Sequence, residues 1–228
     1  MYVIPRLSPS DWLALAVFFI SWAGYAWFSE QSRWSSKGLT GKSHEFRLEW
    51  AYRMLAREVR IVDSNLIGNL MGSVSFYANT TIYIIAGLLA ALGALDKLIN
   101  LSANLHLGGA GSRELIELKL LLLLGSFVYA YFKFTWSLRQ FNLYSILVGA
   151  APNGHRGEAE IDRYATRLAS LNSLAGDDFN RGIRAYYFGL AALSWLVNPL
   201  LMAIFSISVL LILYHRDYRS PAQRVLST

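Results

Sequence analysis

Polar side chains recur along one apolar stretch, residues 66–95, in a pattern that could accommodate a solute. On a helix they fall on two neighbouring ridges: Asn65, Asn69, Ser73, Asn79 and Thr80. Amide and hydroxyl groups can replace the hydration shell of an ion or a small polar solute, so this face is a candidate polar path. The pattern also suits helix packing, because Gly68 and Gly72 would let a second helix approach closely. Both interpretations stay open.

A second group of candidate residues is charged and borders the apolar stretches. It forms a candidate inner basic cluster: Arg57, Arg60, Asp63, Lys133, Arg139, Asn142, Asn180, Arg181 and Arg184. Six cations against one carboxylate give an excess positive potential. This potential suits either anionic lipid headgroups or an anion site at the inner mouth of a path. Lys133 stands in an aromatic run, so it must reach water, pair with Asp63 or line a cavity.

The chain that positions these residues has the composition of a membrane protein. Of its 228 residues, 54% are hydrophobic and only 16% are charged. A spanning helix needs about 20 apolar residues to cross about 30 Å of hydrocarbon. Four stretches poor in charge predict crossings at about residues 12–28, 66–95, 118–137 and 185–214. The sequence therefore predicts one all-α, polytopic membrane domain over residues 1–228.

Two amphipathic segments complete the expected fold. Apolar residues at intervals of three and four over about residues 45–64 predict that the second crossing extends as a helix into the cytoplasm. A similar pattern over about residues 158–175 predicts a cytoplasmic amphipathic helix that pairs with this extension. Within the fourth crossing, Asn198-Pro199 is expected to bend the helix.

Lys and Arg residues predict the orientation in the membrane. Fourteen of them fall on the side of the two long connections and seven on the other side. Cytoplasmic segments carry the excess of Lys and Arg, so both termini are expected outside the cytoplasm of a bacterial inner (plasma) membrane. The net charge of +6 is assigned to these segments, and no nucleic-acid partner is expected.

Residues for covalent or metal chemistry are sparse. The chain has no cysteine, which excludes disulfides, thiolate metal sites and cysteine nucleophiles. The four histidines are scattered without ligand spacing. Neither a Ser/His/Asp set nor a nucleotide-binding loop is present in the sequence. The sequence predicts neither an enzyme nor a bound cofactor or metal.

Three runs of sequence resemble a known family. They are Arg57–Asp63 continuing to Phe76–Thr81, Phe134–Asn142, and Phe179–Phe188. These runs are similar to the domain of unknown function 599 (DUF599) family of integral membrane proteins from bacteria and plants. The resemblance implies a four-crossing membrane fold, and it transfers no activity and no site residues.

Together these features favour an oligomeric inner-membrane protein. The first hypothesis is a channel or passive transporter for a small ion or polar solute, and because four crossings seldom enclose a path alone, it requires a homo-oligomer. The alternative is a structural or accessory membrane subunit that binds a protein partner through its cytoplasmic helices. In either case, anionic lipid headgroups are expected at the basic inner boundary.

Overall fold

The computed structural model describes residues 7–97, 99, 112–152 and 157–226. The elements are α1 (Pro9–Gln31), a 3₁₀ turn (Ser35–Lys37), α2 (Leu39–Leu55), α3 (Ile61–Gly93), α5 (Arg113–Gly149), α6 (Glu158–Leu193), a 3₁₀ turn (Ser194–Leu196), α7 (Pro199–Tyr218) and α8 (Pro221–Leu226). No strand occurs among the residues described. Four segments are long and apolar enough to cross a membrane: α1, α3, α5 and Pro199–Leu226.

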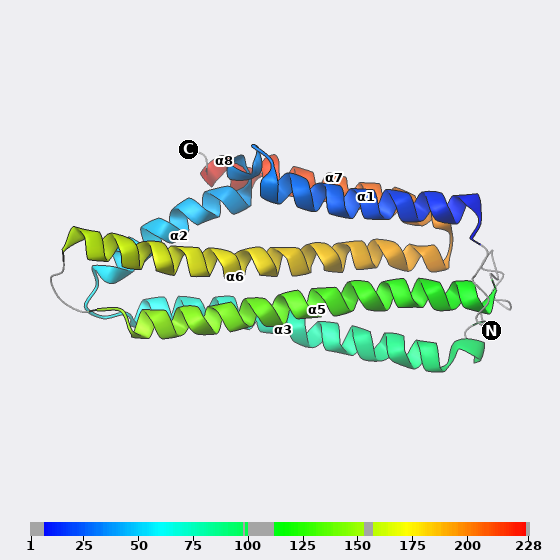
Figure 1. Cartoon of the computed structure of the whole chain (residues 1–228), viewed down its shortest axis with the longest axis horizontal. Coiled ribbons are helices and arrows are strands. Elements are labelled where there is room, and N and C mark those ends of the chain that lie inside the picture. The colour runs from blue at the N-terminus through cyan, green and yellow to red at the C-terminus, as the bar shows by residue number, and fades with distance from the viewer. Residues whose placement is uncertain (1–6, 98, 100–111, 153–156, 227–228) are drawn as a thin grey trace.

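The helices form two layers along the long axis of the molecule (Figure 1). Three helices, α3, α5 and α6, run through both layers. At one end α1 and α7 pack beside them, and we call this end the α1–α7 layer. At the other end α2 packs on α6, and we call this end the α2 layer. Each layer has its own apolar core, with Phe18, Phe188 and Trp195 in the first and Met54 and Leu168 in the second.

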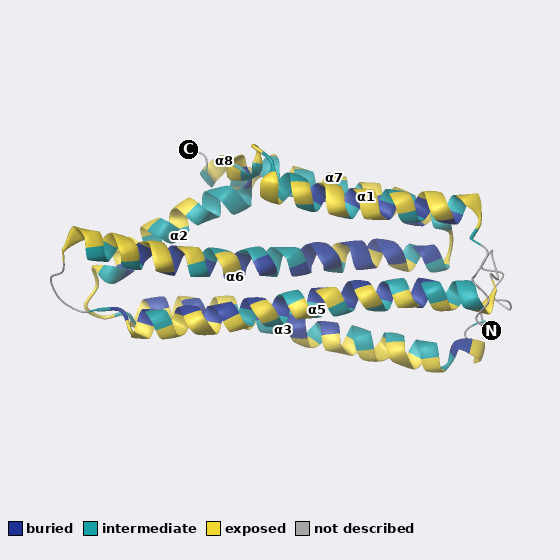
Figure 2. Ribbon diagram, in the orientation of Figure 1, coloured by how far each residue is buried: buried dark blue, intermediate teal, exposed yellow. Residues whose placement is uncertain are grey.

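The C-terminal half of α6, which we call its outer half, lies at the centre of the α1–α7 layer. Figure 2 shows this half of the helix as largely buried, in contrast to the more exposed α1 and α3. Close packing there depends on small residues: a Cβ atom at Gly182 would overlap the Phe134 ring of α5, and one at Gly189 would lie 3.0 Å from the Phe127 ring. Glycine at these positions lets α5 and α6 approach closely along their length.

The expected fourth crossing, residues 185–214, is not one helix. α6 ends at Leu193, and α7 begins at Pro199 and returns alongside α1. The side chain of Asn198 caps α7 by accepting a hydrogen bond from the Leu200 amide at 2.8 Å. Pro199 occupies the first helical position, where its missing N–H would have no partner inside the helix. The Asn198-Pro199 pair therefore starts a new helix where we expected a bend.

Two contacts fix how α7 lies along α1. Near the start of α1, Asp11 accepts a hydrogen bond of 2.8 Å from Trp195 Nε1 in the turn that precedes α7. Near the end of α1, the Tyr25 hydroxyl donates to Asp217 Oδ2 at 2.5 Å. The start of α1 and the end of α7 consequently lie at opposite ends of the α1–α7 layer.

The expected cytoplasmic extension of the second crossing is also divided. α2 ends at Leu55, and α3 begins at Ile61 and runs in a different direction. Side-chain contacts hold the turn between them: Arg57 Nη1 lies 2.5 Å from Asp63 Oδ1. Arg60 donates to the carbonyl oxygens of Ala151 and Pro152, each at 2.9 Å. These contacts end the helix without any proline or glycine.

Candidate binding site between the two layers

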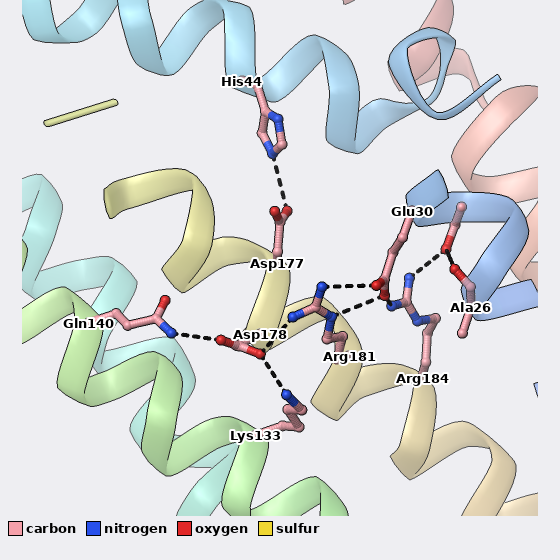
Figure 3. A network of polar contacts seen from close by, with 10 residues as sticks. Ala26, Glu30, His44, Lys133, Gln140, Asp177, Asp178, Arg181 and Arg184 are labelled. Carbon is pink, nitrogen blue, oxygen red and sulfur yellow. Dashed lines mark hydrogen bonds and ion pairs between the residues drawn. The ribbon is translucent and has the colours of Figure 1, made fainter. Parts of the chain in front are cut away.

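A network of charged side chains lies where the two layers meet (Figure 3). At its centre is Asp178 of α6, which is 4% exposed. Its Oδ1 accepts from Lys133 Nζ at 2.9 Å and Arg181 Nη1 at 3.1 Å, and its Oδ2 accepts from Gln140 Nε2 at 2.7 Å. Burial raises the pKa of Asp178, but the hydrogen bonds from Lys133 and Gln140 outweigh it, so the pKa is lower than normal. The carboxylate is therefore held in its charged form.

Glu30, at the end of α1, is the second carboxylate of the network. It accepts two hydrogen bonds from Arg181, at 2.9 and 3.1 Å, in the bidentate arrangement that favours Arg–carboxylate pairs. It also forms an ion pair with Arg184, whose Nη1 donates to Ser29 Oγ at 2.8 Å. Arg181 thus contacts both carboxylates and joins α1 to the α5–α6 pair.

A third contact connects α2 to α6. His44 Nε2 lies 3.1 Å from Asp177 Oδ1, and both side chains are partly exposed. Among the described residues no group of three His, Asp or Glu side chains is arranged to hold a metal ion. The pair is suited to hydrogen bonding with a polar ligand in the adjacent cavity.

Two adjoining cavities open at this level. The first, about 290 Å³ in volume, is lined by Ser29, Glu30, Ser35, Ser36, Thr40, Gly41, His44, Asp177, Asn180, Arg181 and Arg184. The second, about 430 Å³, is lined by Leu39, Thr40, Ser43, Arg47, Tyr77, Phe179, Asn180, Ile183, Arg184, Tyr187, Arg216, Asp217 and Leu226. They share Thr40, Asn180 and Arg184. The first is lined mainly by polar residues, whereas the second is lined by both charged and apolar residues.

Arg47 of α2 is an unusual member of the second cavity. Its Nη1 atom is buried and has no hydrogen-bond partner. The guanidinium lies against Gly176 of α6, where a Cβ atom would overlap it. Burial lowers the pKa of Arg47, and the negative charge of Asp177 opposes this effect only in part. An enclosed cation with a free donor is suited to receive an anion.

The structure divides the predicted inner basic cluster. Four members lie at the network between the layers: Lys133, Asn180, Arg181 and Arg184. Three form the α2–α3 turn: Arg57, Arg60 and Asp63. The other two, Arg139 and Asn142, are exposed on α5. Among the interactions we considered for Lys133, the structure has an ion pair, and its partner is Asp178 rather than Asp63.

The residues of the candidate polar path lie away from both cavities. Asn65, Asn69, Ser73 and Asn79 are exposed, and Thr80 is half-buried. Tyr77 fixes their depth, because its ring packs against Phe134 and Phe179 beside the charged network. The first three path residues therefore belong to the α2 layer, and the other two lie at the border between the layers. They are on an outer surface of α3 and do not face the bundle interior.

Sequence reasoning missed several residues that build the site. Glu30 and Asp178 were not selected, although a carboxylate at the end of an apolar stretch could have been matched with the excess of arginines. Arg47 gave no signal, because it resembles any charged position of an amphipathic helix. Its burial depends on the close approach of α2 to Gly176, which lies inside α6.

Apolar helices long enough to cross a membrane, with ion pairs gathered between two layers, define a multi-pass helical membrane protein. The chain belongs to the family described as "Protein of unknown function, DUF599", whose model matches residues 13–222. This match confirms the family that the three sequence runs resemble. No curated protein matches the chain. No solved structure matches it either.

Proposed function

We propose that the protein acts as a homo-oligomer whose copies meet through one face of α3, and that this shared face forms a path for a small ion or polar solute. The outward face of α3 comprises Asn65, Gly68, Asn69, Gly72, Ser73, Phe76, Asn79, Thr80, Tyr83 and Gly87. The observation that carries the proposal is that these polar and small residues point away from the bundle on a helix apolar enough to cross a membrane. Amides left facing lipid would lack partners.

A path through a single copy has less support. The centre of the α1–α7 layer is packed with aromatic rings: Phe18 lies 5.9 Å from Phe188 between ring centroids, and Trp22 stacks on Phe188 at 5.7 Å. Trp195 and Met202 are fully buried in the same core. Such interiors are packed as densely as organic crystals. A solute path is therefore better placed between copies than inside one.

A second copy is the partner that fits the outward face of α3 best. The 33 residues of α3 span about 50 Å, whereas the hydrocarbon of a bilayer is about 30 Å thick. Exposed apolar side chains continue into the α2 layer, where Val62 is 63% and Leu66 is 45% exposed. A partner must therefore extend beyond the bilayer on the same side and to a similar depth. Another copy of this chain has that shape.

We place the α2 layer on the cytoplasmic side of a bacterial inner membrane. With α7 running back along α1, only three of the 19 Lys and Arg residues that the structure describes belong to the opposite side: Lys97, Arg113 and Lys119. The other 16 described Lys and Arg residues support this orientation more strongly than the division of 14 against 7 that the sequence predicted. In this arrangement the outer half of α6 is a fifth, buried crossing, and the C-terminus is cytoplasmic.

The alternative is a structural or accessory subunit. It is favoured by the position of Asn65, Asn69 and Ser73 in the α2 layer, where water can satisfy their hydrogen bonds. Exposed apolar residues of the same layer, including Phe46 and Val59, provide contact area for a protein partner. In this alternative the outward face of α3 is a packing surface only.

Flux measurements separate the two functions. Purified protein in liposomes is expected to release K⁺, Cl⁻ or glycerol faster than empty vesicles do. Asn79→Leu is expected to lower the flux of the permeant solute at least threefold, because it removes an amide from the path. Ser208→Leu, an equivalent change on α7, serves as the control and is expected to leave flux unchanged. If an oligomer in liposomes releases none of these solutes faster than empty vesicles do, the path is excluded and the accessory role remains.

A further inference from the structure

The second cavity contains a positive charge that the protein itself neutralises only in part. Arg47 forms no ion pair in the described part of the chain, and its Nη1 is both buried and unpaired. Buried charges in proteins are normally paired with an opposite charge, so an unpaired buried donor indicates a place where an anion can bind. An anion bound beside Arg47 would remove this penalty.

Other donors surround the same space. Arg216 reaches it from α7 and Arg184 from α6, where Arg184 is also paired with Glu30. Thr40 and Asn180 add a hydroxyl and an amide. The single carboxylate of the lining, Asp217, is already occupied by the Tyr25 hydroxyl at 2.5 Å and by Arg216 at 3.5 Å. The polar end of the cavity therefore carries a net positive charge. Arginine forks of this kind bind phosphate groups well.

Part of the cavity lining is apolar. It is formed by Tyr77 of α3 and by Phe179, Ile183 and Tyr187 of α6. These residues lie at the level of the charged network, where the helices of the α1–α7 layer end. A volume of about 430 Å³ is within the usual size of ligand sites. The cavity thus offers charged donors and an apolar surface to one ligand.

We propose that this cavity binds the phosphate-bearing head of an anionic membrane lipid, with Arg47 as its principal ligand. The phosphate lies between Arg47 and Arg216, and the start of the acyl chains follows Phe179 and Ile183 toward the bilayer. The site is separate from the outward face of α3, so it does not depend on the path proposed above. A soluble phosphate ester shares the headgroup chemistry, and the experiment distinguishes the two sources.

Thermal unfolding of the purified, delipidated protein in a neutral detergent tests whether the ligand is an anionic lipid or a soluble phosphate ester. Micelles containing phosphatidylglycerol are expected to raise the unfolding temperature in a saturable manner. Phosphatidylcholine micelles are expected to give a clearly smaller shift, because their headgroup carries no net charge. Glycerol 3-phosphate lacks acyl chains and is expected to give little shift at the same concentration. An equal shift from phosphatidylcholine would overturn the anionic specificity, and a full shift from glycerol 3-phosphate would overturn the lipid.

Substitutions test whether Arg47 binds the headgroup. Arg47→Met keeps most of the side-chain volume, removes an unmatched charge, and is expected to unfold at the same or a higher temperature without lipid. Its apparent affinity for phosphatidylglycerol is expected to fall at least tenfold. Arg53→Met changes an exposed arginine of the same helix, paired only with Glu49, and is the matched control. If Arg47→Met does not fold, Arg216→Gln, which changes the second arginine proposed to bind the phosphate, provides the test, with a weaker affinity expected. Unchanged affinity in the tested variant would overturn the site.

Discussion

At the scale of residues, a few side chains hold together helices that are far apart in the sequence. Asp178 of α6 binds Lys133 and Gln140 of α5, while Arg181 and Arg184 of α6 bind Glu30 of α1. Each carboxylate has at least two cationic partners, which is the condition under which a buried charge is stabilised. We therefore expect this network, more than any surface ion pair, to control the stability of the junction between the layers.

Replacing the central carboxylate tests this expectation. Asp178→Asn is expected to lower the free energy of unfolding by roughly 3 kcal/mol at pH 7, because Lys133 loses its ion-pair partner. Asp162→Asn, which changes an exposed carboxylate of the same helix that accepts only from Tyr52, is the control. Its effect is expected to stay below about 0.5 kcal/mol. Denaturant unfolding in detergent, followed by tryptophan fluorescence, measures both.

The same pair of proteins should differ in their response to pH. The pKa of Asp178 is lower in the folded protein than its ordinary value of 3.8. Its contribution to stability is therefore complete above about pH 4 and is lost as the pH falls further. The difference between the wild type and Asp178→Asn should stay constant from pH 8 to 5 and shrink below pH 4. A difference that is absent at pH 7 would show that the network does not stabilise the fold.

At the scale of elements, the turn between α6 and α7 changes the topology of the molecule. The charge-free stretch 185–214 folds as the end of one helix and most of another, and α7 returns to the level where α1 ends. The outer half of α6 can lie between the other helices because small residues, including Gly182, Ala185 and Gly189, let those helices approach it closely. In the orientation that we propose, the chain crosses the membrane five times, so its two ends lie on opposite sides.

Labelling of single cysteines tests this topology, and the chain has no native cysteine to interfere. Ser10→Cys, at the start of α1, is expected to react with a membrane-impermeant maleimide in intact cells. Ser220→Cys, after α7, and Ser35→Cys, after α1, are expected to react only once the membrane is permeabilised. Labelling of Ser10→Cys and Ser220→Cys from the same side would refute the arrangement and restore our first expectation for the termini.

The sequence predicted the apolar helices better than the places where they end. Apolar length is a property of the local sequence, so the class of protein and the first three crossings could be found, with shifted bounds. The turns at residues 56–60 and 194–198 could not be found, because the first depends on contacts of Arg60 with the distant residues Ala151 and Pro152. Asn198-Pro199 was visible, but only the packing of α7 on α1 decides between a bend and a new helix.

At the scale of the whole molecule, the two layers differ in the surface that they expose. The α1–α7 layer has the apolar exterior of a membrane domain, and the α2 layer adds a basic helical extension to it. The ion-pair network and the two cavities lie between them, where a ligand from the lipid or from water could enter. The outward face of α3 runs through both layers and is exposed apart from the half-buried Thr80, which makes self-association the central claim.

Disulfide cross-linking in native membranes tests that claim most directly. Asn69→Cys and Asn79→Cys place single thiols on the outward face of α3, and Leu211→Cys places one on the exposed surface of α7, where Leu211 is 57% exposed. Under mild oxidation we expect both α3 variants to form covalent dimers and Leu211→Cys to stay monomeric. Monomers from both α3 variants, or equal dimer formation by Leu211→Cys, would contradict assembly through α3.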